Sequence, residues 1–215
     1  MFYRLFISLA FSLALLSGCS KPPEPTITLA RAVSIGDLDQ LERNLYWGVN
    51  PNQTDAAGMT PLHVAAQKDS LVMSRILVKH GANLEAQDAK GHTPLLKALI
   101  ARNTIVADFL VKSGARLDPN LALHITAGLG SADRDVIDFL LKRGASLDSL
   151  DDDGNTPLHI AILNDQRVVA KYLINRGARL DISNKAGLTP LALAIARNKP
   201  DIEKILRQFG AQESY

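Results

Sequence analysis

The chain has one cysteine among its 215 residues, Cys19. A single thiol cannot form a disulfide within the chain, and no second cysteine is available for a metal site. Aromatic residues make up 5% of the sequence, too few for a platform on which nucleic-acid bases stack. Neither sign of charge dominates, since 24 Lys and Arg face 22 Asp and Glu. We therefore expect no broad basic surface for a phosphate backbone, and no nucleic-acid partner.

Glycine, in contrast, recurs along the chain at a regular spacing. Gly-Ala pairs recur after a first lone glycine, and the glycines stand at Gly48, Gly81, Gly114, Gly144, Gly177 and Gly210. The intervals between them are 33, 33, 30, 33 and 33 residues. Such a period is typical of stacked copies of one small unit. A stack offers a long binding surface and rarely an active-site pocket.

Each copy of the unit carries the same local signals. Copies two and five begin with Thr60-Pro61-Leu62 and Thr156-Pro157-Leu158. The threonine hydroxyl is placed to cap a helix, and proline suits the first helical position. A second apolar segment follows, and the recurring glycine ends it because glycine adopts left-handed backbone without penalty. An extended polar arm with a turn glycine then leads to the next copy.

The unit is thus a turn, a helix, a loop, a second helix and an arm. Its pattern Gly-x-Thr-Pro-Leu-His-x-Ala, followed by an apolar helix and Gly-Ala, closely resembles the ankyrin repeat. The pattern is almost complete at 58–82 and 154–178, and the resemblance covers about residues 26–215. It implies an all-α solenoid of about six helix–turn–helix repeats with hairpin-like connections. It also implies that His63, His124 and His159 tie adjacent repeats together through backbone hydrogen bonds.

Copy four departs from the pattern. When His124 is aligned with His159, copy four lacks five residues of the arm and turn, including the turn glycine and the Thr-Pro pair. It gains two residues between its helices, within 127–132, and five lost against two gained gives the deficit of three. Asp118 or Asn120 is expected to cap its first helix. The row of hairpins should therefore have a gap, either as neutral loop variation or as a notch shaped for a partner.

The first residues indicate export. Residues 1–18 place Arg4 before an apolar stretch that is too short for a comfortable membrane span. Leu16-Ser17-Gly18-Cys19 resembles the bacterial lipoprotein signal at every position. The resemblance implies that Cys19 becomes the N-terminus and carries acyl chains such as palmitate, which together anchor stably. An ordinary secreted protein with an incidental cysteine is the alternative.

The residue after the cysteine bears on location. In lipoproteins of Gram-negative bacteria an Asp there favours retention in the inner membrane, so Ser20 implies an anchor in the outer membrane, facing the periplasm. Residues 19–25 are then the lipidated cysteine and a short Pro-rich tether. Residues 26–215 form the repeat domain, which must be stable through packing alone.

Enzymatic activity is not expected. An active site needs a nucleophile, a base and an orienting group that converge in a pocket. The histidines here belong to the repeat pattern, none has the spacing of a metal site, and the carboxylates are scattered. Asp151, Asp152 and Asp153 cluster at a hairpin tip but lack the spacing of a calcium loop. We expect no cofactor and no metal.

Ankyrin stacks bind other proteins through their hairpin tips and the concave face of their first helices. Carried over by position, the resemblance predicts these contact residues: Met59, Gln67, Lys68, Lys90, His92, Ile100, Asp152, Asp153, Asn155, Leu163, Asn164, Lys185, Leu188 and Arg197. Trp47 is added because other copies have polar or basic residues there. Packing on the N-terminal cap is an equal alternative for Trp47.

These features predict a protein-binding module on a lipid anchor, monomeric when unbound. Two roles are compatible with the residues. One is an immunity-type inhibitor that binds and neutralises a toxic effector of the cell envelope. The other is a scaffold or support protein for a resident envelope enzyme, for example in stress resistance.

Overall fold

The computed structural model describes residues 21–212, and this part consists of six pairs of α-helices without a β-strand. The first helices of the pairs are α2 (Leu29–Ile35), α4 (Pro61–Gln67), α6 (Pro94–Ile100), α8 (Pro119–Gly128), α10 (Pro157–Leu163) and α12 (Pro190–Ala196). The second helices are α3 (Leu38–Tyr46), α5 (Leu71–Lys79), α7 (Thr104–Lys112), α9 (Arg134–Leu141), α11 (Arg167–Asn175) and α13 (Pro200–Gln208). The prediction of an all-α solenoid with six repeats is confirmed.

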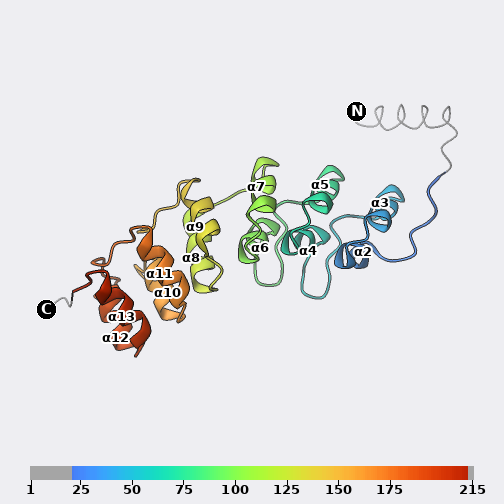
Figure 1. The fold of residues 1–215 in the computed structure, drawn as a ribbon. Coiled ribbons are helices and arrows are strands. Elements are labelled where there is room, and N and C mark those ends of the chain that lie inside the picture. Colours follow the sequence, from blue (N-terminus) through green and yellow to red (C-terminus); the bar gives the residue numbers. More distant parts are fainter. Residues whose placement is uncertain (1–20, 213–215) are drawn as a thin grey trace.

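The pairs stack side by side in the order of the sequence (Figure 1). Each first helix contacts the first helix of the next pair, from α2 through α12, and also the second helix of its own pair. The result is an elongated body with a row of first helices and a row of second helices. Its binding surface is therefore distributed along the stack.

The predicted helix starts are confirmed. Proline is the first helical residue of α4, α6, α10 and α12, and each follows a threonine in extended backbone conformation. In the first repeat, α2 ends at Ile35 and the Asp37 carboxylate caps α3 by accepting from the Gln40 amide at 3.0 Å. The recurring glycines follow the second helices with φ between 80° and 103°, the left-handed conformation that favours glycine.

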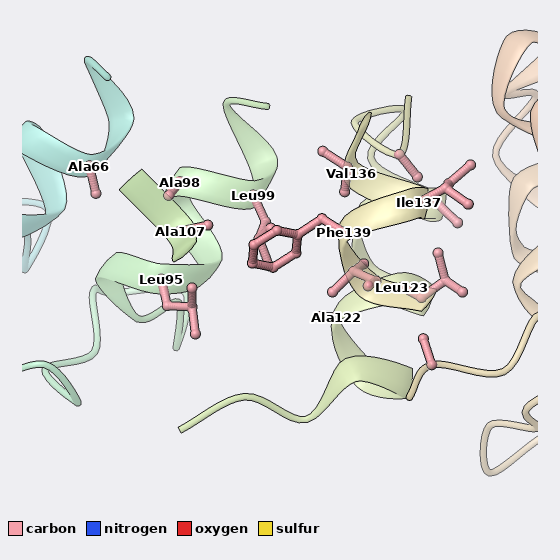
Figure 2. Close-up of a cluster of buried hydrophobic side chains, with 14 of the residues drawn as sticks. Ala66, Leu95, Ala98, Leu99, Ala107, Ala122, Leu123, Val136, Ile137 and Phe139 are labelled. Atoms are coloured by element: carbon pink, nitrogen blue, oxygen red, sulfur yellow. The ribbon is translucent and has the colours of Figure 1, made fainter. Parts of the chain in front are cut away.

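The core runs through all the repeats without interruption. Ala65, Ala98, Ala161 and Ala194, one in each of four first helices, are fully buried. Small side chains at these points let neighbouring helices approach closely, while leucines fill the remaining volume. Figure 2 shows this core at the third and fourth repeats, to which Leu99 of α6 and Phe139 of α9 both contribute buried side chains.

The motif histidines link consecutive repeats, as expected. Nε2 of His63 donates to the His92 carbonyl at 2.9 Å, and His159 donates to the Leu188 carbonyl at 3.0 Å. His124 makes the corresponding bond with the Asn155 carbonyl at 3.1 Å. Each acceptor is the last residue of the next hairpin, so the imidazole fixes that hairpin to the preceding helix.

Candidate protein-binding surface

Four hairpins project beside the row of first helices: Asp55–Met59, Asp88–His92, Asp151–Asn155 and Asn184–Leu188. In each, the first residue's amide donates to the last residue's carbonyl at 3.0 Å, and its side-chain oxygen accepts two amides of the turn. These bonds satisfy the backbone within the turn. The hairpins are therefore rigid platforms for their tip residues.

The hairpins are joined in two pairs. The Ala89 amide donates to the Ala57 carbonyl at 3.0 Å, and the Lys185 amide donates to the Asp153 carbonyl at 3.0 Å. A methyl group at Gly58 would come within 2.9 Å of the Ala89 nitrogen, so glycine permits this close approach. The second and third repeats thus form one pair of hairpins, and the fifth and sixth form the other.

Repeat four has no hairpin, as the spacing predicted. Its first helix, α8, has ten residues where α6 and α10 have seven. Asp118 caps it, and its Oδ1 accepts from the amides of Asn120 and Leu121 at 3.0 Å. Asn120 does not cap the helix. Its side chain instead accepts from the Ser146 amide at 2.8 Å.

This contact of Asn120 replaces one that the arms make elsewhere. Asn52 accepts from the Asn83 amide at 2.7 Å, Glu85 from the Arg116 amide at 2.8 Å, and Asp148 from the Arg179 amide at 2.9 Å. The first turn of α8 therefore takes the place of the shortened arm at the junction of repeats three and four, since Asn120 binds the arm that follows repeat four. The loop after α8 is packed as well, since Ser131 and Ala132 are buried.

A cavity of about 320 Å³ opens where the fourth hairpin is missing. We call it the notch. It is lined by the side of the third hairpin, by α6, by α8 and by the short arm between them: Gln87, Lys90, Gly91, His92, Thr93, Leu95, Leu96, Leu99, Arg116, Leu117, Asp118, Leu121, Ala122 and Ile125. The notch brings together two predicted contact residues, Lys90 and His92.

Leu96 occupies the histidine position of the third repeat, between Leu95 and Lys97. A histidine here would have no carbonyl of a fourth hairpin to bind. The leucine instead makes the wall of the notch apolar. Leu121, which stands at the threonine position of repeat four, adds a side chain that is 57% exposed. A cavity lined mainly by apolar side chains with a few polar groups is typical of a binding site.

The charges at the notch divide into a paired set and an unpaired set. The Asp88 carboxylate is 3% exposed and lies 2.7 Å from Nζ of Lys97. Burial raises the pKa of Asp88, but the hydrogen bond from Lys97 and those from the amides of His92 and Lys90 outweigh burial and hold it far below its ordinary value. Lys90 and Arg116 are exposed at the rim, and neither side chain has an ionic partner within residues 21–212.

Three histidines near this surface, His63, His92 and His159, have a pKa below the ordinary value of the imidazole. Burial lowers the pKa of His63 and His159, against the raising effect of the carbonyls they bind. Burial also lowers the pKa of His92, whose Nδ1 is buried without a hydrogen-bond partner. The side chain of His92 is therefore partly enclosed.

A second hollow, of about 590 Å³, lies between α2 and α4. It brings together three predicted contact residues, Met59, Gln67 and Lys68, with Arg31 and Ser34 of the first repeat. The C-terminal hairpins bring together another group, because Asp153 is bonded to Lys185 through the backbone. The predicted positions thus fall into separate clusters along one side of the stack.

Most of the other predicted contact residues have accessible side chains. Asp152, Asp153, Asn164, Lys185 and Arg197 are exposed, and Ile100, Leu163 and Leu188 are half-buried. Asn155 is the exception, with 5% exposure. Its side chain bonds with Asp151 and Asn184, and its carbonyl accepts from His124. Asn155 therefore holds hairpins together and is not available to a partner.

Trp47 contacts the tether. Its Nε1 donates to the Pro22 carbonyl at 3.3 Å, and Nζ of Lys21 lies 4.9 Å from the centre of its ring. The side chain remains 37% exposed and meets Tyr46 edge to face. Trp47 therefore packs on the tether, a contact that neither alternative for this residue had included, and it stays partly exposed.

Residues 21–212 contain no group of three His, Cys, Asp or Glu side chains arranged to hold a metal ion. Within the same residues, every helix is too short or too polar to cross a bilayer. The export signal and Cys19 lie outside the described residues.

Comparison with known families identifies the repeat. The model of ankyrin repeats in three copies matches residues 29–122 and again residues 123–213. The chain belongs to the ankyrin repeat family. Ankyrin repeats mediate protein–protein interaction, which assigns this chain the coarse role of a binding module.

Among curated sequences, potassium channel AKT2/3 of Arabidopsis thaliana is 31% identical over 146 residues, 67% of this chain. The chain spans 18% of that channel's length. The likeness therefore concerns the ankyrin repeats and not the channel as a whole.

Two solved structures are similar along most of the stack. The human ASB11 ankyrin repeat domain matches with a TM-score of 0.70 and 24% identity, covering 88% of this chain and 86% of its own. The complex of the predatory endopeptidase Bd0816 from Bdellovibrio bacteriovorus with immunity protein Bd3460 also contains a similar chain. It matches with a TM-score of 0.67 and 26% identity, covering 86% of this chain and 99% of its own.

Sequence reasoning missed several residues that line the notch. The gap in repeat four was predicted, yet Leu96, Arg116 and Leu121 were not among the contact residues. The contact residues were assigned by carrying over the family's contact positions, and this procedure did not select these residues because repeat four has no matching hairpin. The available signal was Leu96 itself, an apolar residue where the second, fourth and fifth repeats have histidine.

Proposed function

We propose that this protein is a lipid-anchored periplasmic binding module of the immunity type, which captures and neutralises a toxic effector of the cell envelope. The observation that carries the proposal is the likeness, over 86% of this chain, to a chain in the complex of an endopeptidase with an immunity protein. Two hollows and several exposed charged residues beside the first helices supply a surface for such a partner.

The anchor is the second part of the proposal. Acylation of Cys19 would hold the first repeat near the outer membrane through residues 20–25, with the stack facing the periplasm. Stable anchoring requires more than one acyl chain. A Cys19→Ser variant should lose labelling by fatty acid and leave the membrane fraction. Retention of both would refute the anchor while leaving the binding role intact.

Affinity capture from envelope extracts, followed by mass spectrometry, tests the binding role. Lys68→Glu, on the side of the first helices, should weaken capture by about tenfold or more if it lies at the centre of the interface. Lys171→Glu is a matched control, because Lys171 is also exposed but lies on a second helix, α11. Equal effects of the two changes would contradict this placement of the interface.

The partner's identity separates the two roles. An immunity protein should bind one toxin tightly, and cells without it should die only when that toxin is present. A scaffold should show no dependence on a toxin, and its loss should impair a resident envelope enzyme. The second result would replace the immunity role by the support role.

A further inference from the structure

The notch combines three features that the intact junctions lack. The first is that the hairpin that would fill the notch is absent. The second is that Leu96 stands where other repeats have the histidine that binds such a hairpin. The third feature is the Lys90 carbonyl, which stands where Ala57 and Asp153 accept an amide from the following hairpin. Within the described residues this carbonyl has no hydrogen-bond partner. The third hairpin thus ends in an open acceptor beside an apolar cavity.

Shape and polarity define what fits the notch. A cavity of about 320 Å³ lies at the lower end of the range of roughly 300–1,000 Å³ for ligand sites. Leu95, Leu96 and Leu99 line it from α6, and Leu121 and Ile125 line it from α8. At the neighbouring junction a hairpin occupies the corresponding space and bonds to the Ala57 carbonyl. The occupant that best matches both features is a tight turn of polypeptide carrying an apolar side chain.

The charged residues at the rim of the notch indicate which sign of charge the bound turn should carry. Lys90 and Arg116 have no ionic partner within the described residues. Asp88 is paired with Lys97, whereas Asp118 and Glu85 accept backbone amides, and none of these three carboxylates forms an ion pair with Lys90 or Arg116. Two free cations at the mouth of an apolar cavity favour an acidic occupant.

We propose that the notch receives an acidic turn of the partner protein, with one apolar side chain inserted between α6 and α8, a backbone amide bound to the Lys90 carbonyl, and carboxylates beside Lys90 and Arg116. The turn completes the row of hairpins that repeat four interrupts. This inference rests on the proposed function, since it names the element of the partner that the module recognises.

A peptide of this chemistry exists within the chain itself. Residues 149–156, Ser-Leu-Asp-Asp-Asp-Gly-Asn-Thr, form an acidic hairpin with the exposed Leu150. The probe is this segment, cyclised and fluorescently labelled, titrated into the full-length protein and followed by fluorescence polarisation. We expect saturable binding, and about tenfold weaker binding for a probe whose three Asp are Asn, because the rim is cationic.

Two variants of matched exposure locate the probe. Leu121→Asp places a charge in the notch and should weaken binding about tenfold or more. Leu150→Asp is the control, because Leu150 is 58% exposed against 57% for Leu121 but lies outside the notch.

A chimera in which residues 149–156 replace residues 119–121 exchanges three residues for eight and restores the missing five. Its filled notch should bind no probe, while circular dichroism shows an intact helical fold.

Several results would overturn the inference: no saturable binding, equal binding by the chimera, or equal effects of Leu121→Asp and Leu150→Asp. Self-association of the chain that Leu121→Asp abolishes would identify a second copy as the occupant and refute a heterologous turn. These failures differ from failure of the proposed function. If capture from the envelope succeeds and is unchanged in the chimera, only the notch inference is wrong.

Discussion

The junction between repeats two and three can be compared with the junction between repeats three and four. In the first, His63 binds the His92 carbonyl and the two hairpins are joined by the Ala89 amide. In the second, leucine replaces the histidine, no hairpin follows, and the cavity remains. The helices nevertheless stack at both junctions. Burial of the leucine and alanine core therefore assembles the repeats, whereas the hydrogen bonds of hairpin and histidine determine the outline of the binding surface.

The second helices compensate for the missing hairpin. Arg143, at the end of α9, pairs with Asp108 of α7 and stacks on Phe139, with its guanidinium carbon 3.6 Å from the centre of the ring. Phe139 belongs to the buried core of these repeats (Figure 2). Arg102 donates to the Gly130 carbonyl at 3.0 Å. Junction three–four is thus held from the side opposite the notch, which leaves the notch open.

The largest expected effect comes from making the intact junction resemble the open one. His63→Leu should lower the free energy of unfolding by about 3 kcal/mol, because the buried Thr60 amide and the His92 carbonyl both lose their partner. Leu96→His, the reverse change at the open junction, should not raise the free energy of unfolding, because no hairpin carbonyl is present there to accept a hydrogen bond from the imidazole. Urea denaturation of both variants provides the measurement. A stabilised Leu96→His variant would contradict the account of that position.

Glycine substitutions test the same comparison at the hairpins. Gly58 and Gly91 both have positive φ, 72° and 76°, so alanine costs about 1 kcal/mol at either site from backbone strain. Only at Gly58 does the added methyl group also press on the next hairpin, whereas at Gly91 nothing lies within 4 Å. Gly58→Ala should therefore be more destabilising than Gly91→Ala by about 1 kcal/mol. Equal melting temperatures for the two variants would show that the hairpins are not pressed together.

Acid should loosen the intact junctions first. Burial lowers the pKa of His63 and His159 in the folded protein, so the unfolded chain binds more protons as the pH falls through 6.5. Stability is then full above that value and decreases below it, until the folded histidines are protonated too. Thermal melts between pH 8 and pH 5 should show this decrease. His63→Gln should have a weaker pH dependence than the wild type, and an unchanged slope would exclude His63 as the titrating group.

Ion pairs between second helices should have the smallest effect. Asp108 pairs with Arg143 across junction three–four, and Asp138 pairs with Arg176 across junction four–five. Asp→Asn at either site should cost about 0.5 to 1 kcal/mol, as for partly exposed pairs. We expect Asp108→Asn to be the more costly, because Asp108 also pairs with Lys112 and its junction has no hairpin. High salt should reduce both effects in chemical denaturation, and a larger loss for Asp138→Asn would contradict the compensation described above.

Sequence reasoning predicted the fold because the repeat is governed by local signals. Thr-Pro at a helix start and glycine after a helix end act within one turn of backbone, so the helix boundaries and the missing fourth hairpin could be anticipated. The contact surface was harder to predict. Asn155 was assigned to it by position, but its side chain is buried between Asp151 and Asn184, a contact between residues 29 positions apart. Trp47 faces the tether for the same reason, since Lys21 and Pro22 are distant along the chain.

The order of helices, their number and the register of the motif follow from the amino-acid sequence by itself, because capping, proline geometry and apolar spacing act over a few residues. The tertiary structure decided which hairpins meet, which carbonyl is left without a partner and which leucines face a cavity. These properties depend on how far apart two repeats lie once the core is packed. A shortened arm is visible in the sequence, but whether its neighbours close over it or leave a notch depends on the packing of both rows of helices.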